Sequence, residues 1–156
     1  MKINLLIAFC LPLVAACAEK PDETPPPAAD AAQEPAALTR SASAEDARVF
    51  FISPADGDTV DNPIRVVFGT EGMAVVPAGN DTPHSGHHHL LIDTELPELG
   101  LPIPKDEHHV HFGDGSTETE IMLEPGEHTL QLLLGDHLHI PHDPPLNSGK
   151  IKVTVK

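Results

Sequence analysis

The stretch KIKVTVK, residues 150–156, gives the clearest indication of the fold. Its apolar residues at positions 151, 153 and 155 alternate with lysine and threonine. Successive side chains of a β-strand project to opposite faces, so this alternation is typical of a strand that packs one face on a core and turns the other to water. The C-terminal residues therefore predict a β-strand over 151–155.

Further short apolar stretches of this kind precede it, each bounded by turn residues. They lie at 49–53, 64–68, 73–76, 87–93, 110–112, 117–123 and 128–134. Proline or glycine interrupts every stretch that is long enough to form an amphipathic helix. The pattern predicts an all-β domain over residues 45–156, an immunoglobulin-like antiparallel β-sandwich of about seven or eight strands, with a small barrel as the competing shape.

Two segments of different composition precede this domain. Residues 17–44 are rich in alanine, proline and acidic residues, with three consecutive prolines at 25–27, and this composition predicts a disordered tether. Residues 1–16 combine a positively charged start with a short apolar run, which is typical of a signal peptide. That run is too short for a stable membrane span.

The predicted signal peptide leads into VAAC, residues 14–17, which resembles the bacterial lipobox. The resemblance implies that Cys17 is diacylated and becomes the first residue of the mature protein, which makes the membrane a partner of the chain. Ala18 stands where the usual inner-membrane retention signal has aspartate, which favours the outer membrane, facing the periplasm. Removal of Cys10 with the signal peptide then leaves no thiol for a disulfide or a thiolate metal site. A plain cleaved signal peptide with an incidental cysteine is the alternative.

The composition disfavours nucleic-acid binding and draws attention to histidine. The formal net charge is −15, from 24 acidic and 9 basic residues, which opposes binding to phosphate. There is no tryptophan or tyrosine on which bases would stack. All eleven histidines fall between His84 and His142, so they require a local explanation.

Three His-x-His patterns lie within this region, at positions 87 and 89, 109 and 111, and 137 and 139. Residues i and i+2 of a strand project from the same face about 6.5 to 7 Å apart, so two imidazoles can converge on one metal ion. Copper or zinc is the expected ion, because imidazole suits both and no thiolate is left. The candidate ligands are His87, His89, His109 and His111, followed by His139 and His142.

The strand pattern also predicts the faces on which these side chains lie. If Val110 points into the core, His109 and His111 both point outward. In the stretch 87–93, His88 shares one face with the apolar residues at 90 and 92, which leaves His87 and His89 together on the other face. His88 is therefore the least certain ligand of the triple.

Other histidines and two aspartates are expected to have different roles. His128 follows Pro-Gly at the corner where immunoglobulin-like sandwiches place a structural tyrosine, so we expect it to bond nearby backbone. His84 and His108 adjoin polar loops and are expected to be solvated. Asp93 and Asp136 are candidates to accept a hydrogen bond from the far nitrogen of a ligand histidine.

Three motifs together resemble one bacterial family of envelope proteins and lipoproteins that carries a domain of unknown function. They are GHHHLLID at 86–93, HVHFG followed by TETE at 109–113 and 117–120, and GDHLHIPHDPP at 135–145. The resemblance covers residues 48–156 and implies a shared fold and a shared histidine site, but no activity. In architecture the chain is also similar to the small β-sandwich copper carriers of the periplasm, as an analogy of fold and compartment.

The sequence thus predicts a lipid-anchored protein of the bacterial cell envelope that captures or hands over copper or zinc. Its mechanism would be ligand exchange at an exposed histidine site, with a metal donor or acceptor protein as partner. The alternative is a non-catalytic immunoglobulin-like binding or structural module, whose histidines form a hydrogen-bonded network or a pH switch. No enzymatic activity is expected, because the sequence indicates no substrate pocket, although a metalloenzyme with an open coordination position is a further alternative.

Overall fold

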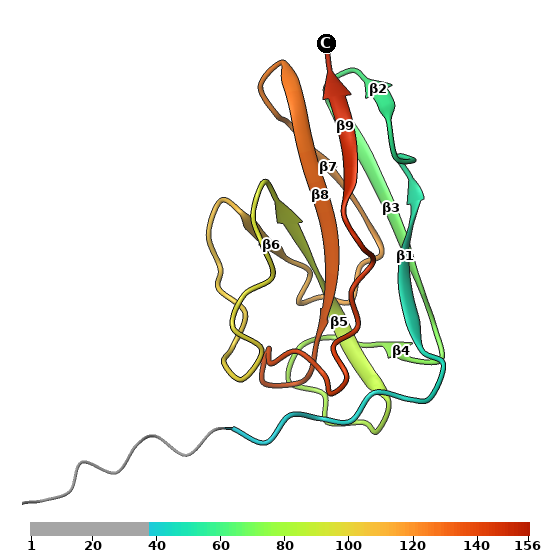
Figure 1. Cartoon of the computed structure of the whole chain (residues 1–156). Coiled ribbons are helices and arrows are strands. Elements are labelled where there is room, and N and C mark those ends of the chain that lie inside the picture. Colours follow the sequence, from blue (N-terminus) through green and yellow to red (C-terminus); the bar gives the residue numbers. More distant parts are fainter. Residues whose placement is uncertain (1–37) are drawn as a thin grey trace, which may run out of the picture. The chain divides into compact units, whose positions relative to one another are not determined.

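The computed structural model describes residues 38–156 of the chain (Figure 1). The predicted signal peptide, Cys17 and most of the predicted tether lie outside the described residues. Within residues 38–156 every regular element is a β-strand, and no helix is long and apolar enough to cross a membrane. The all-β class predicted from the alternating pattern is confirmed.

The strands are short and follow one another along the chain. They are β1 (Arg48–Ser53), β2 (Asp58–Val60), β3 (Ile64–Glu71), β4 (Ala74–Val75), β5 (Ser85–Ile92), β6 (His109–His111), β7 (Glu118–Ile121), β8 (Gly126–Gly135) and β9 (Ile151–Val155). Every stretch that the sequence indicated as a strand overlaps one of them. The predicted bounds of β9, residues 151–155, are exact because its alternation is uninterrupted.

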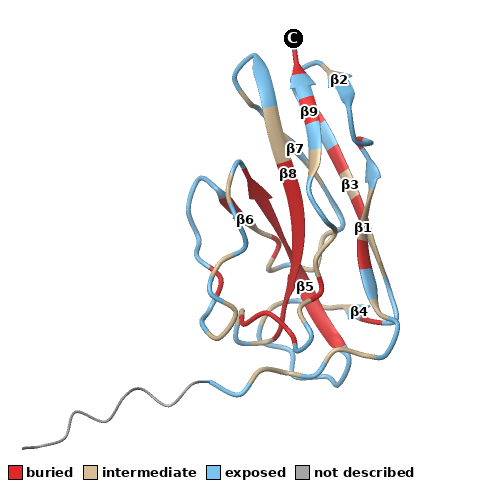
Figure 2. Ribbon diagram, viewed as in Figure 1, coloured by how far each residue is buried: buried red, intermediate tan, exposed pale blue. Residues whose placement is uncertain are grey.

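The strands form two sheets that face each other. The smaller sheet has the order β1-β3-β7, and the larger has the order β2-β9-β8-β5-β4, with β6 also paired to β5. Apolar side chains from both sheets fill the space between them, including Val66 and Phe68 of β3 and Leu90 of β5. Figure 2 shows β5 buried along its whole length and β8 buried over its second half, whereas buried and more exposed residues alternate along β3 and β9. Because fully burying each large apolar side chain is worth about 1.5–3 kcal/mol, this layer is the main source of stability.

Strand β5 differs from the others because all eight of its residues are buried. One face of β5 looks into the space between the sheets. The other face is covered by residues 93–108, since Ile103 packs there against Leu91 and Leu133. The strand therefore lies in the middle of three layers, and the outermost layer is a loop.

Two features of the sandwich-like fold differ from the sequence prediction. Strand β2 was not expected, because its three residues carry no apolar alternation and form a strand only by pairing with β9. The sequence predicted antiparallel sheets, but the pairs β2·β9 and β4·β5 are parallel. Both parallel pairs lie at sheet edges and are two or three residues long. The immunoglobulin-like relationship itself stays a prediction.

Candidate metal centre

The two strands β5 and β6 bring three histidines together on the face of the large sheet that the loop covers. His87 and His89 are two residues apart on β5 and therefore share a face. In the antiparallel pairing of β5 with β6, His111 lies directly opposite His89. The predicted phase is correct: His88 and Leu90 point to the other side, toward the core between the sheets.

A fourth histidine reaches the same place from a loop. His139 lies in the turn that follows β8, where its backbone has the left-handed φ of 66°. Its ring centre is 4.9 Å from that of His87 and 4.8 Å from that of His111. We call His87, His89, His111 and His139 the histidine cluster.

The distances between the ring nitrogens of the cluster suit a metal ion. One ring nitrogen from each of His87, His89 and His111 lies within 4.8 Å of the other two. The Nε2 atoms of His87 and His89 are 3.2 Å apart. Two nitrogens bound tetrahedrally to one zinc ion at 2.0–2.1 Å are separated by about 3.3 Å, so this pair already has the required spacing.

Two nitrogens of the cluster lack hydrogen-bond partners. His89 Nδ1 and His111 Nε2 are both buried, and neither has a partner among the described residues. A buried polar atom without a partner costs about 1–3 kcal/mol. A metal ion bound at the Nε2 atoms would take up the lone pair of His111 Nε2, whereas His89, whose Nε2 lies beside that of His87, would keep an unpartnered Nδ1.

His87, His89 and His111 are neutral near pH 7, which leaves a lone pair on each of these three rings. Burial lowers the pKa of His87 to about 4, and the neighbouring rings of His139 and His111 add to this effect. Burial and the same crowding of histidines lower the pKa of His89 to about 2. The pKa of His111 is lowered for the same reasons. A metal ion would therefore not have to displace protons from these three side chains.

Two glycines make room for the rings. A Cβ atom at Gly113 would lie only 2.8 Å from His111 Nε2 and would overlap the ring more closely at Cε1. A Cβ atom at Gly135, which pairs with His87 across the strands, would lie 3.0 Å from His89 Nε2. Neither glycine has a positive φ, so both are required here for space rather than for backbone conformation. Neither glycine was expected at the site from the sequence, although HVHFG shows Gly113 two residues after His111.

Two of the six predicted ligands lie outside the cluster. His109 lies on the same face of β6 as His111 but two residues away, opposite Leu91. Its Nδ1 is 2.8 Å from Asp106 Oδ1. His142 is buried with Nδ1 3.3 Å from the carbonyl oxygen of Leu134 and Nε2 3.1 Å from that of Ser85. The pairing of His142 with backbone on both sides directs it away from the cluster.

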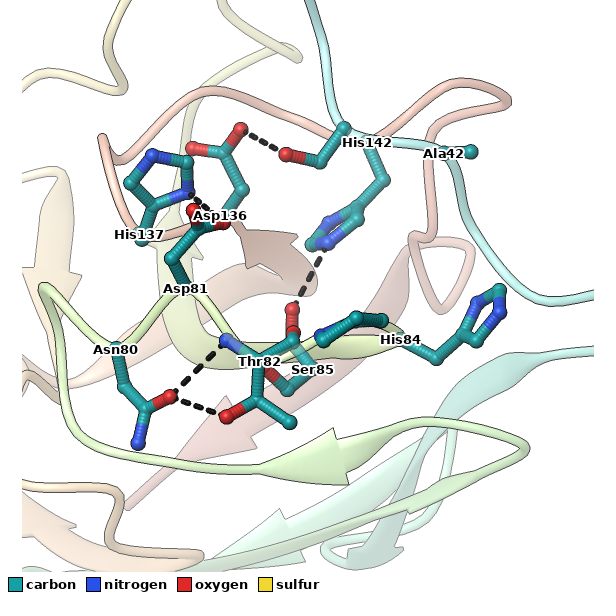
Figure 3. Close-up of a pocket in the computed structure, with 11 residues that line it drawn as sticks. Ala42, Asn80, Asp81, Thr82, His84, Ser85, Asp136, His137 and His142 are labelled. Carbon is teal, nitrogen blue, oxygen red and sulfur yellow. Dashed lines mark hydrogen bonds and ion pairs between the residues drawn. The ribbon is translucent and has the colours of Figure 1, made fainter.

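The ring of His142 instead borders a cavity of about 170 Å³ at the end of the large sheet (Figure 3). Asp136, His137 and His142 lie on one side of this cavity, and Thr82 and Ser85 lie on the other. His137 faces Asp81, with 3.3 Å between Nδ1 and Oδ1. Each buried side-chain nitrogen or oxygen in the lining has a hydrogen-bond partner within the protein, so none of these atoms requires a ligand to satisfy it.

The remaining histidines have structural or solvent-exposed positions. His88 is fully buried between the sheets and contacts Thr70 Oγ1 through Nε2 at 2.9 Å. His128 bonds the carbonyl oxygen of Glu124 at 2.8 Å, as the comparison with a structural tyrosine predicted. His84 and His108 are exposed, as expected.

Two expectations about the surroundings of the cluster are wrong. Asp93 does not support a ligand, because its carboxylate lies 2.6 Å from Nδ1 of His128 instead. Asp136 contacts no ligand ring, because its carboxylate accepts hydrogen bonds from Ser41, Leu138 and Ile140. The site is also less exposed than predicted: His87 and His89 are each 1 % exposed, since the loop layer covers their face of the sheet.

The fold and the site together define an all-β, sandwich-like protein with a cluster of four histidines, of which His87 and His89 are buried and His111 and His139 partly buried. Residues 66–156, more than half of the chain, match the family model described as Domain of unknown function (DUF4399), and the chain belongs to that family. The matched region includes the whole histidine cluster. No curated protein and no solved structure matches the chain.

Proposed function

We propose that this domain binds a transition metal, copper or zinc, through His87, His89 and His111, with His139 as the fourth ligand. The observation that carries the proposal is the convergence of buried, neutral imidazoles within 4.8 Å of one another. These three rings are held by paired strands, and the buried His111 Nε2, which has no partner among the described residues, is available to a ligand that accepts a lone pair.

The ligand chemistry narrows the choice of ion. Four imidazoles without thiolate or carboxylate suit Zn²⁺ and Cu²⁺, and at equal geometry copper binds more tightly. The cluster brings no negative charge of its own, so a bound dication would keep its full charge. Negative charge nearby comes from Asp136, which acts to raise the pKa of His87, and from Asp114, which acts to raise that of His111.

We further propose that binding serves capture or hand-over of the metal rather than catalysis. The supporting feature is His139, which sits on a loop and is only partly buried, so it is the ligand that can leave first. A lipid anchor at Cys17, as the VAAC stretch predicts, would hold the domain in the cell envelope near a donor or acceptor protein. The number of imidazoles leaves little room for a substrate in the coordination shell, which argues against a metalloenzyme.

The test is titration of the purified, untagged chain with Zn²⁺ and Cu²⁺ by calorimetry, together with elemental analysis. One ion per chain at micromolar or tighter affinity is expected for the wild type, with loss of that site in His87→Ala/His89→Ala. The matched control is His84→Ala/His108→Ala, which removes two exposed histidines and is expected to leave the stoichiometry unchanged.

Because His87 and His89 are buried, circular dichroism must show that the double variant is folded. His111→Ala provides a second test, since this side chain is only partly buried. No stoichiometric binding by folded wild-type protein would refute the metal site. The 3.2 Å contact between His87 and His89 would then be one bond of a structural histidine network.

A further inference from the structure

The loop that carries His139 is shaped by the side chain of Asp136. Oδ1 of Asp136 accepts hydrogen bonds from the backbone N–H groups of Leu138 and Ile140, at 2.9 Å and 3.0 Å. The backbone adds bonds from His139 N–H to Asp136 O and from Asp136 N–H to Ile140 O, both at 2.9 Å. These bonds enclose His139 and hold it in the left-handed conformation, which a non-glycine residue rarely adopts.

Asp136 is itself held by the segment through which the chain enters the domain. Oδ2 of Asp136 accepts a hydrogen bond from the hydroxyl of Ser41 at 2.8 Å. Asp136 is 1 % exposed, and among residues 38–156 its carboxylate forms no ion pair, so hydrogen bonds from neutral donors stabilise its charge. The loss of one donor would leave a buried carboxylate oxygen without a partner.

Residues 40–43 also bind residues 141–143, which follow the His139 loop. Arg40 donates to the carbonyl oxygen of Pro141 at 2.9 Å and to that of His142, and its guanidinium lies 3.2 Å from Asp143 Oδ1. The backbone of Ser41 and Ser43 bonds Asp143 at 2.9 Å and 3.1 Å. Residues 40–43 thus join both sides of the His139 loop, although about a hundred residues separate the two in sequence.

We infer that residues 40–43 and Asp136 form a clamp that positions His139 as the fourth metal ligand and so sets the rate at which metal leaves the cluster. This inference rests on the proposed metal site. The three strand-borne ligands are fixed by the pairing of β5 with β6 and need no such support. Only His139 depends on a loop, so a change in the clamp acts on one ligand of four.

Release of the metal would begin at this ligand. When Ser41 and Arg40 hold the loop, His139 stays within reach of the ion, and the site is closed. When these contacts break, the loop can move and His139 can leave the ion. Three histidines and one free coordination position then remain, and a ligand from an acceptor protein can bind at that position. The clamp lies where the chain enters the domain, so a partner that contacts this segment would promote release.

The experiment measures the rate at which a strong chelator removes Zn²⁺ from the full chain. Ser41→Ala, Asp136→Asn and Arg40→Ala are compared with wild type, and Arg48→Ala, which removes an exposed arginine paired with Glu71, is the matched control. We expect release to accelerate about tenfold in Ser41→Ala and Asp136→Asn, the usual scale for groups that orient a metal ligand. Arg48→Ala should release zinc at the wild-type rate.

A second background separates positioning of His139 from a general loss of stability. In His139→Ala protein the fourth ligand is absent, so adding Ser41→Ala should accelerate release no further. The visible spectrum of bound Co²⁺ gives an independent readout: Asp136→Asn should shift it toward that of His139→Ala. Equal acceleration by Ser41→Ala in both backgrounds, or none in wild type, overturns the clamp.

The outcomes also distinguish the clamp from the metal site itself. If wild type binds zinc but His139→Ala releases it at the wild-type rate, His139 is no ligand and the clamp is refuted, while the three-histidine site stands. If folded wild type binds neither zinc nor copper, the proposed function is refuted and the clamp with it.

Discussion

A single residue, Gly113, illustrates how closely the sequence around the cluster is adapted to the rings. The imidazole of His111 folds back over the Gly113 backbone and occupies the space that any side chain there would need. Placing an imidazole against backbone in this way requires glycine, for the same reason that glycine allows close approach of a ligand.

We predict that Gly113→Ala weakens metal binding without removing any ligand. The added methyl group displaces His111 from its position opposite His89, so zinc affinity should fall about tenfold or more. The control is Gly100→Ala, because a Cβ atom at that position meets nothing within 4 Å. Titration by calorimetry compares the two, and equal affinities would mean that His111 does not contribute a ligand.

Residue types and spacing predicted part of this site, for reasons that the structure makes clear. The period of two in a strand suffices to place His87 and His89 on one face, and this prediction depends on local geometry alone. Which residue of β6 stands opposite His89 depends on the register between two strands that a loop of sixteen residues separates, so the pattern offered His109 and His111 equally. The register selects His111.

At the scale of elements, the loops determine the remaining differences between expectation and structure. The sequence indicated His139 and His142 alike as loop histidines, because a loop has no periodicity from which a direction can be read. Asp136 distinguishes them: its hydrogen bonds turn the chain so that His139 faces the cluster, whereas His142 bonds the backbone of β5 and β8. For the same reason, the sequence did not predict that residues 93–108 cover one face of β5.

One contact between elements predicts a pH-dependent stability. Asp93, directly after β5, and His128 of β8 lie 2.6 Å apart. The hydrogen bond from His128 to Asp93 raises the histidine pKa above its ordinary value of 6.5. For Asp93, burial raises the carboxyl pKa, but hydrogen bonds from Thr129 and His128 outweigh burial and lower it below 3.8.

The sign of the effect follows from these two shifts. The stability that His128 gains is fully present below pH 6.5 and is lost as the pH rises through the raised pKa, while that of Asp93 is lost as the pH falls through its lowered pKa. Asp93→Asn keeps the left-handed backbone at this position, where φ is 53°, but removes the charge. It should lower the free energy of unfolding by about 1 kcal/mol at pH 6, because the pair is partly exposed, and by less at pH 9.

Urea unfolding at the two pH values measures this difference. Asp61→Asn, which removes the same charge from an exposed position, is the control and should show the same small effect at both. A loss of stability in Asp93→Asn that does not change between pH 6 and pH 9 would show that the charge on His128 makes no contribution.

For the molecule as a whole, the proposed metal site would contribute to the stability of the fold. The four histidines come from two strands of the large sheet and a loop that is tied to residues 40–43, so a bound ion would link parts of the domain that are far apart in sequence. This region contains buried nitrogens without hydrogen-bond partners, beside the small apolar cluster of Leu91, Ile103 and Leu133. A bound ion would add a bond to each of its ligands there.

We therefore predict that zinc raises the midpoint of thermal unfolding. At a free zinc concentration one hundred times the dissociation constant, binding to the folded state adds about 2.7 kcal/mol to the free energy of unfolding. For a domain of this size that corresponds to an increase of roughly 10 °C, which calorimetry at pH 7.5 with and without chelator would measure. Any binding of zinc to histidines of the unfolded chain would reduce the shift, so His87→Ala/His89→Ala is the necessary control. It retains the other histidines but should show no increase. A midpoint that zinc leaves unchanged in wild type would mean that the ion does not prefer the folded state, and a lowered midpoint that it prefers the unfolded chain. Either result would mean that the cluster is no folded-state zinc site.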